Sequence, residues 1–243
     1  QRLSTNDVEK PDISGAIQTV LTNEKGRIVE VVAVLERGEG GLLLVGQTPE
    51  SLVLKQWIEQ YIIMEDIRVA VLSDELIHFI VYDSMQKVKD ALGSSMPTDS
   101  RSFEENLSAV KQTHIISLKH SREEVTKALL EVGLVGSERS DYEEYRVIQG
   151  IPGFPNELST SYNPLEAGLL PLVSFTKGCY IGQEVIARLD SYNKVQRRLV
   201  RLKMEGLPLK LPEQILFERE ECGTITSALK LRHSSECRGL GYV

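Results

Sequence analysis

The residue types best suited to chemistry lie together in one segment, Lys177-Gly178-Cys179-Tyr180-Ile181-Gly182-Gln183-Glu184. The apolar spacing that follows Gly182 predicts a helix, so Cys179 stands just before a helix N-terminus. The free N–H groups and the dipole at such an end favour an anion. Lys177 lies two residues away, which in an extended segment puts both side chains on the same side. A cation and a helix start together favour a nucleophilic thiolate at Cys179.

An inert role for Cys179 stays open from these residues alone, because a single cysteine beside a helix is more often a small buried hydrophobe. Cys222 and Cys237 lie in strand- or loop-like stretches, which favours that plain, buried role for both. Three widely spaced cysteines without a C-x-x-C pair do not make a disulfide framework, and this predicts a reducing, cytoplasmic compartment. Only four histidines accompany the three cysteines and no C-x-x-C pair is present, so no metal site is predicted.

Length and composition exclude several classes of protein. The chain has 243 residues, of which 41% are apolar and 26% charged, as in a soluble globular protein. Its net charge of -7 argues against a protein whose main task is wrapping nucleic acid. No apolar run reaches the roughly 18 residues that a membrane helix needs, so no membrane partner is expected. The polar start at 1–7 lacks Met, and we expect the protein to continue upstream.

The first third of the chain predicts strands around one helix. Residues 28–35 are β-branched and apolar, and 42–45 form a second apolar run, so each predicts a strand. From 50 to 63 the apolar residues recur at helical spacing, while 69–72 and 76–82 are further strand candidates. Strands with hairpin-like spacing around a single helix favour an α+β fold over a doubly wound parallel sheet.

The rest of the chain divides into a mixed part and an all-β part. Residues 114–118 predict a strand, and Ser121 with Glu124 forms a capping box for the helix that follows. Ser140 with Glu143 repeats this signature. Alternating apolar and charged residues after 190 predict the strands of a small all-β module. The predicted domains are 1–93, 94–190 and 191–243, with the turn-rich stretch 94–100 at the first boundary.

The segment 177–184 resembles the K-G-C-[FY]-x-G-Q-E signature of YgfZ-like proteins. Further stretches resemble the same family in the same order, namely Arg2–Val8, Thr22–Arg27, Arg146–Pro152 with Glu157-Leu158, and Gly223–Ser227 with Gly239–Val243. Nearly the whole chain is thus similar to the folate-binding aminomethyltransferase superfamily. A leading segment and the end of the family's terminal barrel are expected to be absent.

This resemblance implies two α+β domains and a C-terminal β-barrel around a central channel. It also implies that the channel holds tetrahydrofolate, and that the protein assists the maturation of iron–sulfur proteins, including enzymes that modify tRNA. The expected partners are reduced folate and iron–sulfur client proteins. By match to the signature, Lys177 and Cys179 are the expected catalytic residues.

Six residues are predicted to contact folate. A pterin ring is held between apolar or aromatic faces with an amide or carboxylate on its edge, and its glutamate tail attracts cations. The candidates are Asn6, Glu30, Arg146, Tyr180, Gln183 and Glu184. Plainer roles stay open for three of them: a turn-forming side chain for Asn6, an outward-facing strand residue for Glu30, and an interdomain salt bridge for Arg146.

Two other functions stay open. The glycine-cleavage aminomethyltransferase resembles the chain at 23–35, but it carries a pair of aspartates where this chain has Glu30-Val31, which argues against aminomethyl transfer. The second is a non-catalytic scaffold that docks a partner or tRNA. A cluster of five cations speaks for RNA or folate-polyglutamate contacts, although a solvated strand face is the plainer explanation. These cations are Lys194, Arg197, Arg198, Arg201 and Lys203.

Overall fold

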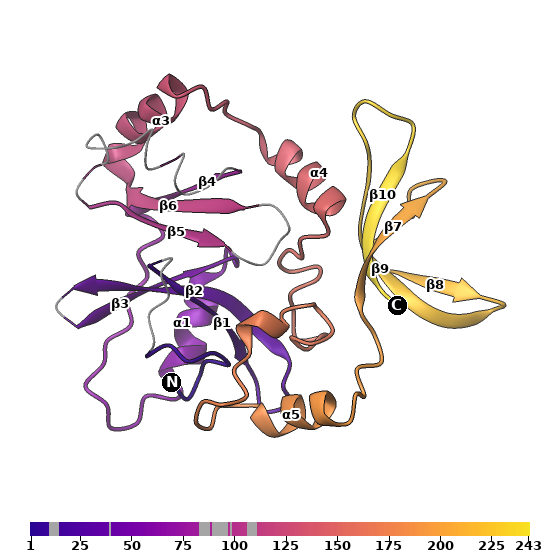
Figure 1. The fold of residues 1–243 in the computed structure, drawn as a ribbon, viewed down its shortest axis with the longest axis horizontal. Helices are drawn as coiled ribbons and strands as arrows, with labels where there is room; N and C mark the ends of the chain where they lie inside the picture. The colour runs from indigo at the N-terminus through magenta and orange to yellow at the C-terminus, as the bar shows by residue number, and fades with distance from the viewer. Residues whose placement is uncertain (10–14, 39, 83–87, 89–96, 98, 106–110) are drawn as a thin grey trace. The chain divides into compact units, whose positions relative to one another are not determined.

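The chain forms two compact units that interleave in sequence (Figure 1). The computed structural model describes residues 1–9, 15–38, 40–82, 88, 97, 99–105 and 111–243. Unit 1 contains residues 1–10, 17–48 and 138–243, and unit 2 contains 11–16 and 49–137. The predicted division into three consecutive domains stays a prediction, and its first boundary at 93/94 lies outside the described residues.

Unit 1 begins with a three-stranded antiparallel sheet in the order β1-β2-β3. Its strands are β1 (Ile17–Thr22), β2 (Ile28–Gly38) and β3 (Gly41–Gly46). The predicted strands at 28–35 and 42–45 are confirmed. The central strand buries Val31 and Val32 on opposite faces, which explains why its apolar run is nearly continuous rather than alternating.

Helices and loops connect this sheet to the end of unit 1. They are α4 (Arg139–Gln149), the 3-10 turn η3 (Leu170–Leu172) and α5 (Gln183–Ser191). The helix predicted after Gly182 is confirmed as α5. The capping box of α4 is formed by Glu138 and Asp141, not by Ser140 and Glu143, because the helix begins two residues earlier than predicted.

The C-terminal part of unit 1 is an open, four-stranded antiparallel sheet in the order β7-β10-β9-β8. Its strands are β7 (Leu199–Met204), β8 (Glu213–Phe217), β9 (Glu220–Lys230) and β10 (Cys237–Tyr242). The edge strands β7 and β8 do not pair with each other, so the predicted barrel is not closed within the described residues. Four strands are also far fewer than the roughly eight that enclose a side-chain-filled barrel. Helix α4 packs against β9 and β10.

Unit 2 contains the third antiparallel sheet, in the order β4-β6-β5, and two α-helices within its described residues. Its elements are α1 (Ser51–Glu59), β4 (Leu76–Val81), β5 (Arg101–Glu105), β6 (Gln112–Leu118), the 3-10 turn η2 (Lys119–Ser121) and α3 (Arg122–Glu131). A core of Val81, Ile115, Val125 and Leu129 joins the sheet to α3. The strands predicted at 76–82 and 114–118 are confirmed, and the first predicted helix is shorter than expected.

Two local predictions in unit 2 were wrong. Residues 69–72 form no strand, because β propensity alone does not suffice without a neighbouring strand to complete the ladder. Ser121 makes no side-chain cap, since it belongs to the preceding 3-10 turn and lacks the extended backbone of a capping residue. None of the described helices is long and apolar enough to cross a membrane.

Candidate functional site

The Cys179 loop, residues 173–182, connects η3 to α5 and is bound along its length by the start of the chain. The Ser174 N–H donates to the Thr5 carbonyl (2.9 Å), and the Ile181 N–H donates to the Arg2 carbonyl (3.0 Å). On the other side, the Thr22 hydroxyl at the end of β1 donates to the Ile181 carbonyl (2.6 Å). Both flanks of Cys179 are therefore fixed by backbone hydrogen bonds.

A glycine-to-glycine contact joins this loop to the turn between β1 and β2. Gly182 (φ +81°) and Gly26 (φ +65°) both adopt left-handed backbone. A Cβ atom on Gly182 would lie 2.5 Å from the Asn23 carbonyl oxygen and 2.8 Å from the Gly26 Cα. The Asn23 side chain closes that turn by accepting from the N–H groups of Lys25 and Arg27. Two of the stretches that resemble the family thus touch backbone to backbone.

Cys179 is exposed, so its sulfur is accessible and the buried alternative for it is wrong. Cys237 is buried as expected, whereas Cys222 is exposed on β9 and only donates weakly to the Ile215 carbonyl. Its side chain lies outside the core because the residues around it on β9 face solvent.

The Lys177 ammonium contacts the first residues of the chain. Nζ donates to the carbonyl oxygens of Gln1 (2.7 Å) and Ser4 (2.6 Å) and to the Ser4 hydroxyl (3.3 Å). It also lies 5.4 Å from the centre of the Tyr180 ring. Partial burial lowers the pKa of Lys177, and the nearby carboxylates of Asp7 and Glu9 oppose this shift. Within the described part of the chain no hydrogen bond joins Lys177 to Cys179.

Tyr180 points into the interior beside the same loop. Its side chain packs with Val173, Ile186 and Leu165 and is only 7% exposed. Its hydroxyl is buried and has no hydrogen-bond partner in the described residues. Burial raises the pKa of Tyr180 to about 12. Tyr180 therefore acts as an apolar anchor for the loop, held in its neutral form.

We expect Tyr180→Phe to raise the free energy of unfolding at neutral pH by up to about 1 kcal/mol, since it removes a buried donor without a partner. A second effect appears at high pH. Between the ordinary tyrosine pKa of 10.0 and the raised pKa of about 12, the unfolded phenol loses its proton while the folded one keeps it, so wild-type stability falls as pH rises. The variant is expected to lose less stability above pH 10, as measured by urea unfolding at several pH values. The exposed Tyr192→Phe is the control, and parallel profiles for wild type and Tyr180→Phe would contradict the prediction.

Glu30 is buried on β2, and its carboxylate is held by backbone donors. It is 1% exposed and accepts hydrogen bonds from the N–H groups of Val31 (2.9 Å), Gln47 (3.2 Å) and Thr48 (3.1 Å). The outward-facing alternative for Glu30 is therefore wrong. Burial raises the pKa of the carboxyl, and the three N–H donors oppose that shift. The side chain holds the end of β3 against β2.

Arg146 lies in a buried ion-pair network between α4, the loop 150–157 and β9. Its guanidinium donates to Glu143 (2.7 Å), Glu157 (3.0 Å) and the Ser227 hydroxyl (3.0 Å). It is 4% exposed, and a Cβ on Gly153 would lie 3.1 Å from it. The structure thus places Arg146 in a salt bridge, which is the plainer of its two predicted roles.

The other three predicted folate contacts, Asn6, Gln183 and Glu184, are not buried. Asn6 donates to the Gln18 carbonyl (2.9 Å) and accepts from the Asp7 N–H (2.9 Å), so its amide shapes a turn. Gln183 is the first residue of α5, and Glu184 is exposed in the first turn of that helix.

These contacts do not fit a folate site as they stand. The polar groups of Asn6, Glu30 and Arg146 are all engaged within unit 1, and the Tyr180 ring is packed in its core. Among the six, Gln183 and Glu184 are not buried, and the Tyr180 hydroxyl has no partner in the described part of the chain but is enclosed in the core. The predicted folate contacts therefore stay predictions, and the placement of these side chains gives them no support.

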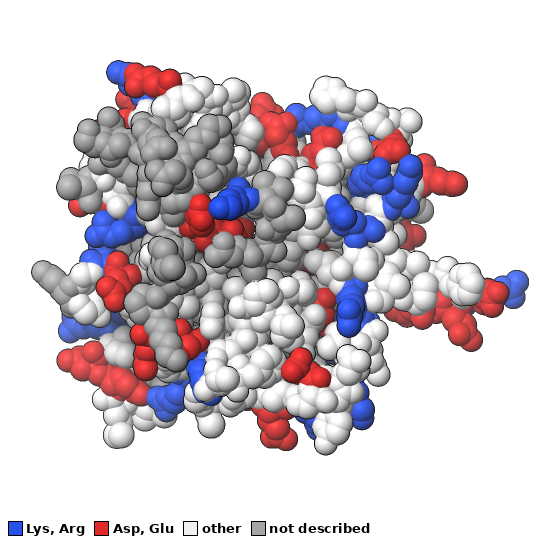
Figure 2. All heavy atoms as spheres, in the orientation of Figure 1, with Lys and Arg blue, Asp and Glu red and all other residues white. Residues whose placement is uncertain are grey.

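The basic cluster after residue 193 is largely paired. Arg197 donates to the buried Glu166 (3.2 Å), Arg201 donates to the Ile148 carbonyl (3.1 Å), and Lys203 pairs with Glu236 (2.8 Å). In Figure 2, acidic and basic side chains are interspersed on the visible face of the C-terminal sheet. These contacts favour a solvated strand face over a nucleic-acid surface.

Sequence reasoning missed two buried carboxylates that organise unit 1. Glu157 is fully buried and accepts from Arg146, Thr226 and Ser227. Glu166 is 6% exposed and accepts from Arg27 and Arg197. The only signal for Glu157 was its place in a stretch that resembles the family, and Glu166 gave none.

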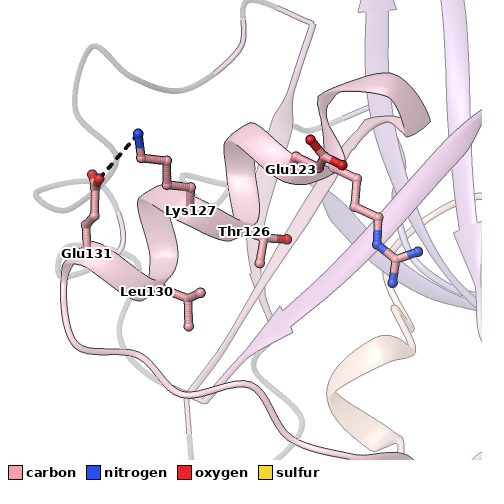
Figure 3. Close-up of a pocket in the computed structure, with 6 residues that line it drawn as sticks. Glu123, Thr126, Lys127, Leu130 and Glu131 are labelled. Atoms are coloured by element: carbon pink, nitrogen blue, oxygen red, sulfur yellow. Dashed lines mark ion pairs between the residues drawn. The ribbon is translucent and has the colours of Figure 1, made fainter.

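A pocket of about 600 Å³ lies on the surface of α3 in unit 2 (Figure 3). It is lined by one helix, which carries the Lys127–Glu131 ion pair (3.8 Å), and contains no predicted site residue. In the described residues no group of three or more His, Cys, Asp or Glu side chains is arranged to hold a metal ion.

Comparisons with known proteins agree with the architecture. No protein-family model matches the chain. The mouse mitochondrial iron-sulfur cluster assembly factor IBA57 is 44% identical over 82 residues, which are 32% of this chain and 23% of that protein. The tRNA-modifying protein YgfZ of Hamiltonella defensa is 25% identical over 87% of this chain and 67% of its own length. The chain thus spans about a quarter of the first relative and two thirds of the second.

A solved structure supports the same fold. The glycine cleavage system aminomethyltransferase T of Bartonella henselae superposes with a TM-score of 0.77 over 99% of this chain and 71% of its own, at 15% identity. At that identity the likeness shows the fold alone. The chain thus has the fold of aminomethyltransferase T, and its sequence is similar, at modest identity, to proteins of the YgfZ and IBA57 kind.

Proposed function

We propose that the protein acts in the maturation of iron–sulfur proteins and that Cys179 is the residue it presents to its clients. The observation that carries the proposal is an exposed cysteine on a loop whose two flanks are fixed by hydrogen bonds to the Thr5 and Arg2 carbonyls and from the Thr22 hydroxyl. An accessible sulfur held in one place suits a soft ligand or a nucleophile. The name of the IBA57 relative, an iron-sulfur cluster assembly factor, points to the same area of biochemistry, and the name of the YgfZ relative points to tRNA modification.

The clients in this proposal are iron–sulfur enzymes, and a link to tRNA runs through those that modify it. The sulfur would act in a reducing compartment, which suits a chain whose three cysteines are all free. Reduced folate is the small molecule to test first, by isothermal titration on wild type and on Cys179→Ala. No step of the proposal depends on folate.

Neither alternative function is favoured by a specific contact. Aminomethyl transfer needs a carboxylate free to act on the reacting amine, and the Glu30 carboxylate is occupied by three backbone donors. A docking scaffold for RNA needs unpaired cations, and the side chains of Arg197, Arg201 and Lys203 are engaged within the protein.

We expect Cys179→Ser to abolish maturation while leaving the fold unchanged. The test is the activity of iron–sulfur enzymes in a strain whose only copy of this function is the variant. Cys222→Ser is the matched control, because it also changes an exposed cysteine of unit 1. Both substitutions are expected to change the free energy of unfolding by less than about 0.5 kcal/mol. Wild-type enzyme activity with Cys179→Ser would refute the proposed role.

A further inference from the structure

We propose that Lys177 is a positioning residue. Its ammonium holds residues 1–5 against the Cys179 loop by hydrogen bonds, and it does not act on the sulfur itself. The proposal rests on the proposed function in one respect, namely that the loop presents Cys179 to a client. The contacts that carry it, and the experiment that tests it, are independent of that function.

All three donors of the Lys177 ammonium are engaged. A lysine ammonium carries three N–H donors and no acceptor. In this structure Nζ has three oxygen partners, the carbonyls of Gln1 and Ser4 and the Ser4 hydroxyl. To reach a substrate or the Cys179 sulfur, Lys177 would have to release one of these contacts; the two to carbonyl oxygens, at 2.6 and 2.7 Å, are short, and the 3.3 Å contact to the Ser4 hydroxyl is the longest.

The segment 1–5, which Lys177 contacts at Gln1 and Ser4, also holds the loop through Arg2 and Thr5. The segment 1–5 receives the N–H groups of Ser174 and Ile181 on its Thr5 and Arg2 carbonyls, and the Thr5 hydroxyl donates to the Leu172 carbonyl (2.7 Å). Lys177 supplies the contact in the middle of the loop, between these two. The exposed Cys179 lies within the span from Lys177 to Ile181.

The segment 1–5 is itself fixed to β1 at Ser4 and Thr5. Ser4 is 5% exposed and forms an isolated β-bridge with Leu21 of β1, while the Thr5 N–H donates to the Val20 carbonyl (3.0 Å). The ammonium therefore ties the loop to the β1-β2-β3 sheet through Ser4. The centre of the Tyr180 ring lies 5.4 Å from the Lys177 Nζ, so the ammonium also makes a cation–π contact within the loop.

Hydrogen exchange of the intact protein tests whether the Lys177 contacts hold the loop. We expect Lys177→Met to speed the exchange of the Ser174 and Ile181 amides by about tenfold, because charged hydrogen bonds that fix their acceptors are lost. Lys194→Met is the matched control, since Lys194 makes the same ring contact, 5.4 Å from Tyr192, without carbonyl partners among the described contacts. Lys177→Arg retains donors for both carbonyls and is expected to restore most of the protection. Wild-type exchange in Lys177→Met would overturn the proposal.

A second readout separates positioning from activation of the thiol. The pH dependence of Cys179 alkylation by iodoacetamide is measured in a Cys222→Ala background, where the remaining Cys237 is buried. Positioning predicts the same pH midpoint in Lys177→Met and in its Lys177 parent. A midpoint about one pH unit higher in the variant would show that the ammonium stabilises the thiolate directly, and would overturn the proposal. Neither readout uses iron–sulfur enzymes, so both stand whatever becomes of the proposed function.

Discussion

Glu157→Ala is expected to lower the free energy of unfolding by about 3–5 kcal/mol, because it leaves the buried Arg146 guanidinium without its main counter-charge. The Glu157 carboxylate is fully buried and accepts four hydrogen bonds. The donors are Arg146 Nη1 (3.0 Å), the Gly153 N–H (3.0 Å), and the hydroxyls of Thr226 and Ser227. The substitution thus removes the hydrogen bonds that hold the loop after α4 to β9 of the C-terminal sheet.

Glu143→Ala is the matched control for this prediction. Glu143 also pairs with Arg146, at 2.7 Å, but its side chain is 38% exposed and water can replace it. Its loss is expected to cost less than about 1 kcal/mol. Urea unfolding followed by far-ultraviolet circular dichroism measures both, since the fluorescence of the single tryptophan, Trp57, reports on unit 2. Equal losses in the free energy of unfolding for Glu157→Ala and Glu143→Ala would mean that burial does not determine how much Glu157 contributes to stability.

Local periodicity predicted the elements that carry the site. The β-branched run at 28–35 and the helical spacing after Gly182 depend on neighbours a few residues away, and both elements form. Two glycines in the signature left room for an approaching backbone, and at Gly182 the Asn23–Gly26 turn occupies that room. The same pattern placed Cys179 just before a helix; α5 has its N-cap at Gly182, and Cys179 lies three residues before that cap and is exposed.

The partners of the charged residues could not be predicted in this way. The acceptors of Lys177 are backbone carbonyls more than 170 residues earlier, and a carbonyl leaves no mark in the amino-acid sequence. From the sequence, Glu30 is predicted to be an exposed strand residue. The alternation of apolar and polar residues does not show that the N–H groups of Gln47 and Thr48 lie beside its buried carboxylate. Glu157 meets Thr226 across 69 residues of chain. Each of these contacts depends on how distant segments assemble.

Gly182→Ala is expected to lower the free energy of unfolding by about 2–5 kcal/mol, from two separate causes. The left-handed backbone at φ +81° disfavours any side chain. The added Cβ would also lie 2.5 Å from the Asn23 carbonyl oxygen and 2.8 Å from the Gly26 Cα. Because both atoms belong to backbone, neither can rotate away, and the start of α5 must separate from the turn between β1 and β2.

Two other glycines of unit 1 separate these causes. Gly168 has the same left-handed backbone (φ +75°) with no atom within 4 Å of its Cβ position, so Gly168→Ala measures backbone strain alone, expected at about 1–2 kcal/mol. Gly178→Ala adds a Cβ in open space and is expected to change stability by less than about 0.5 kcal/mol. The excess of Gly182→Ala over Gly168→Ala is then the energy of the contact with the turn. Equal losses for these two would show that the turn moves aside freely, in which case it could not hold the Cys179 loop in place.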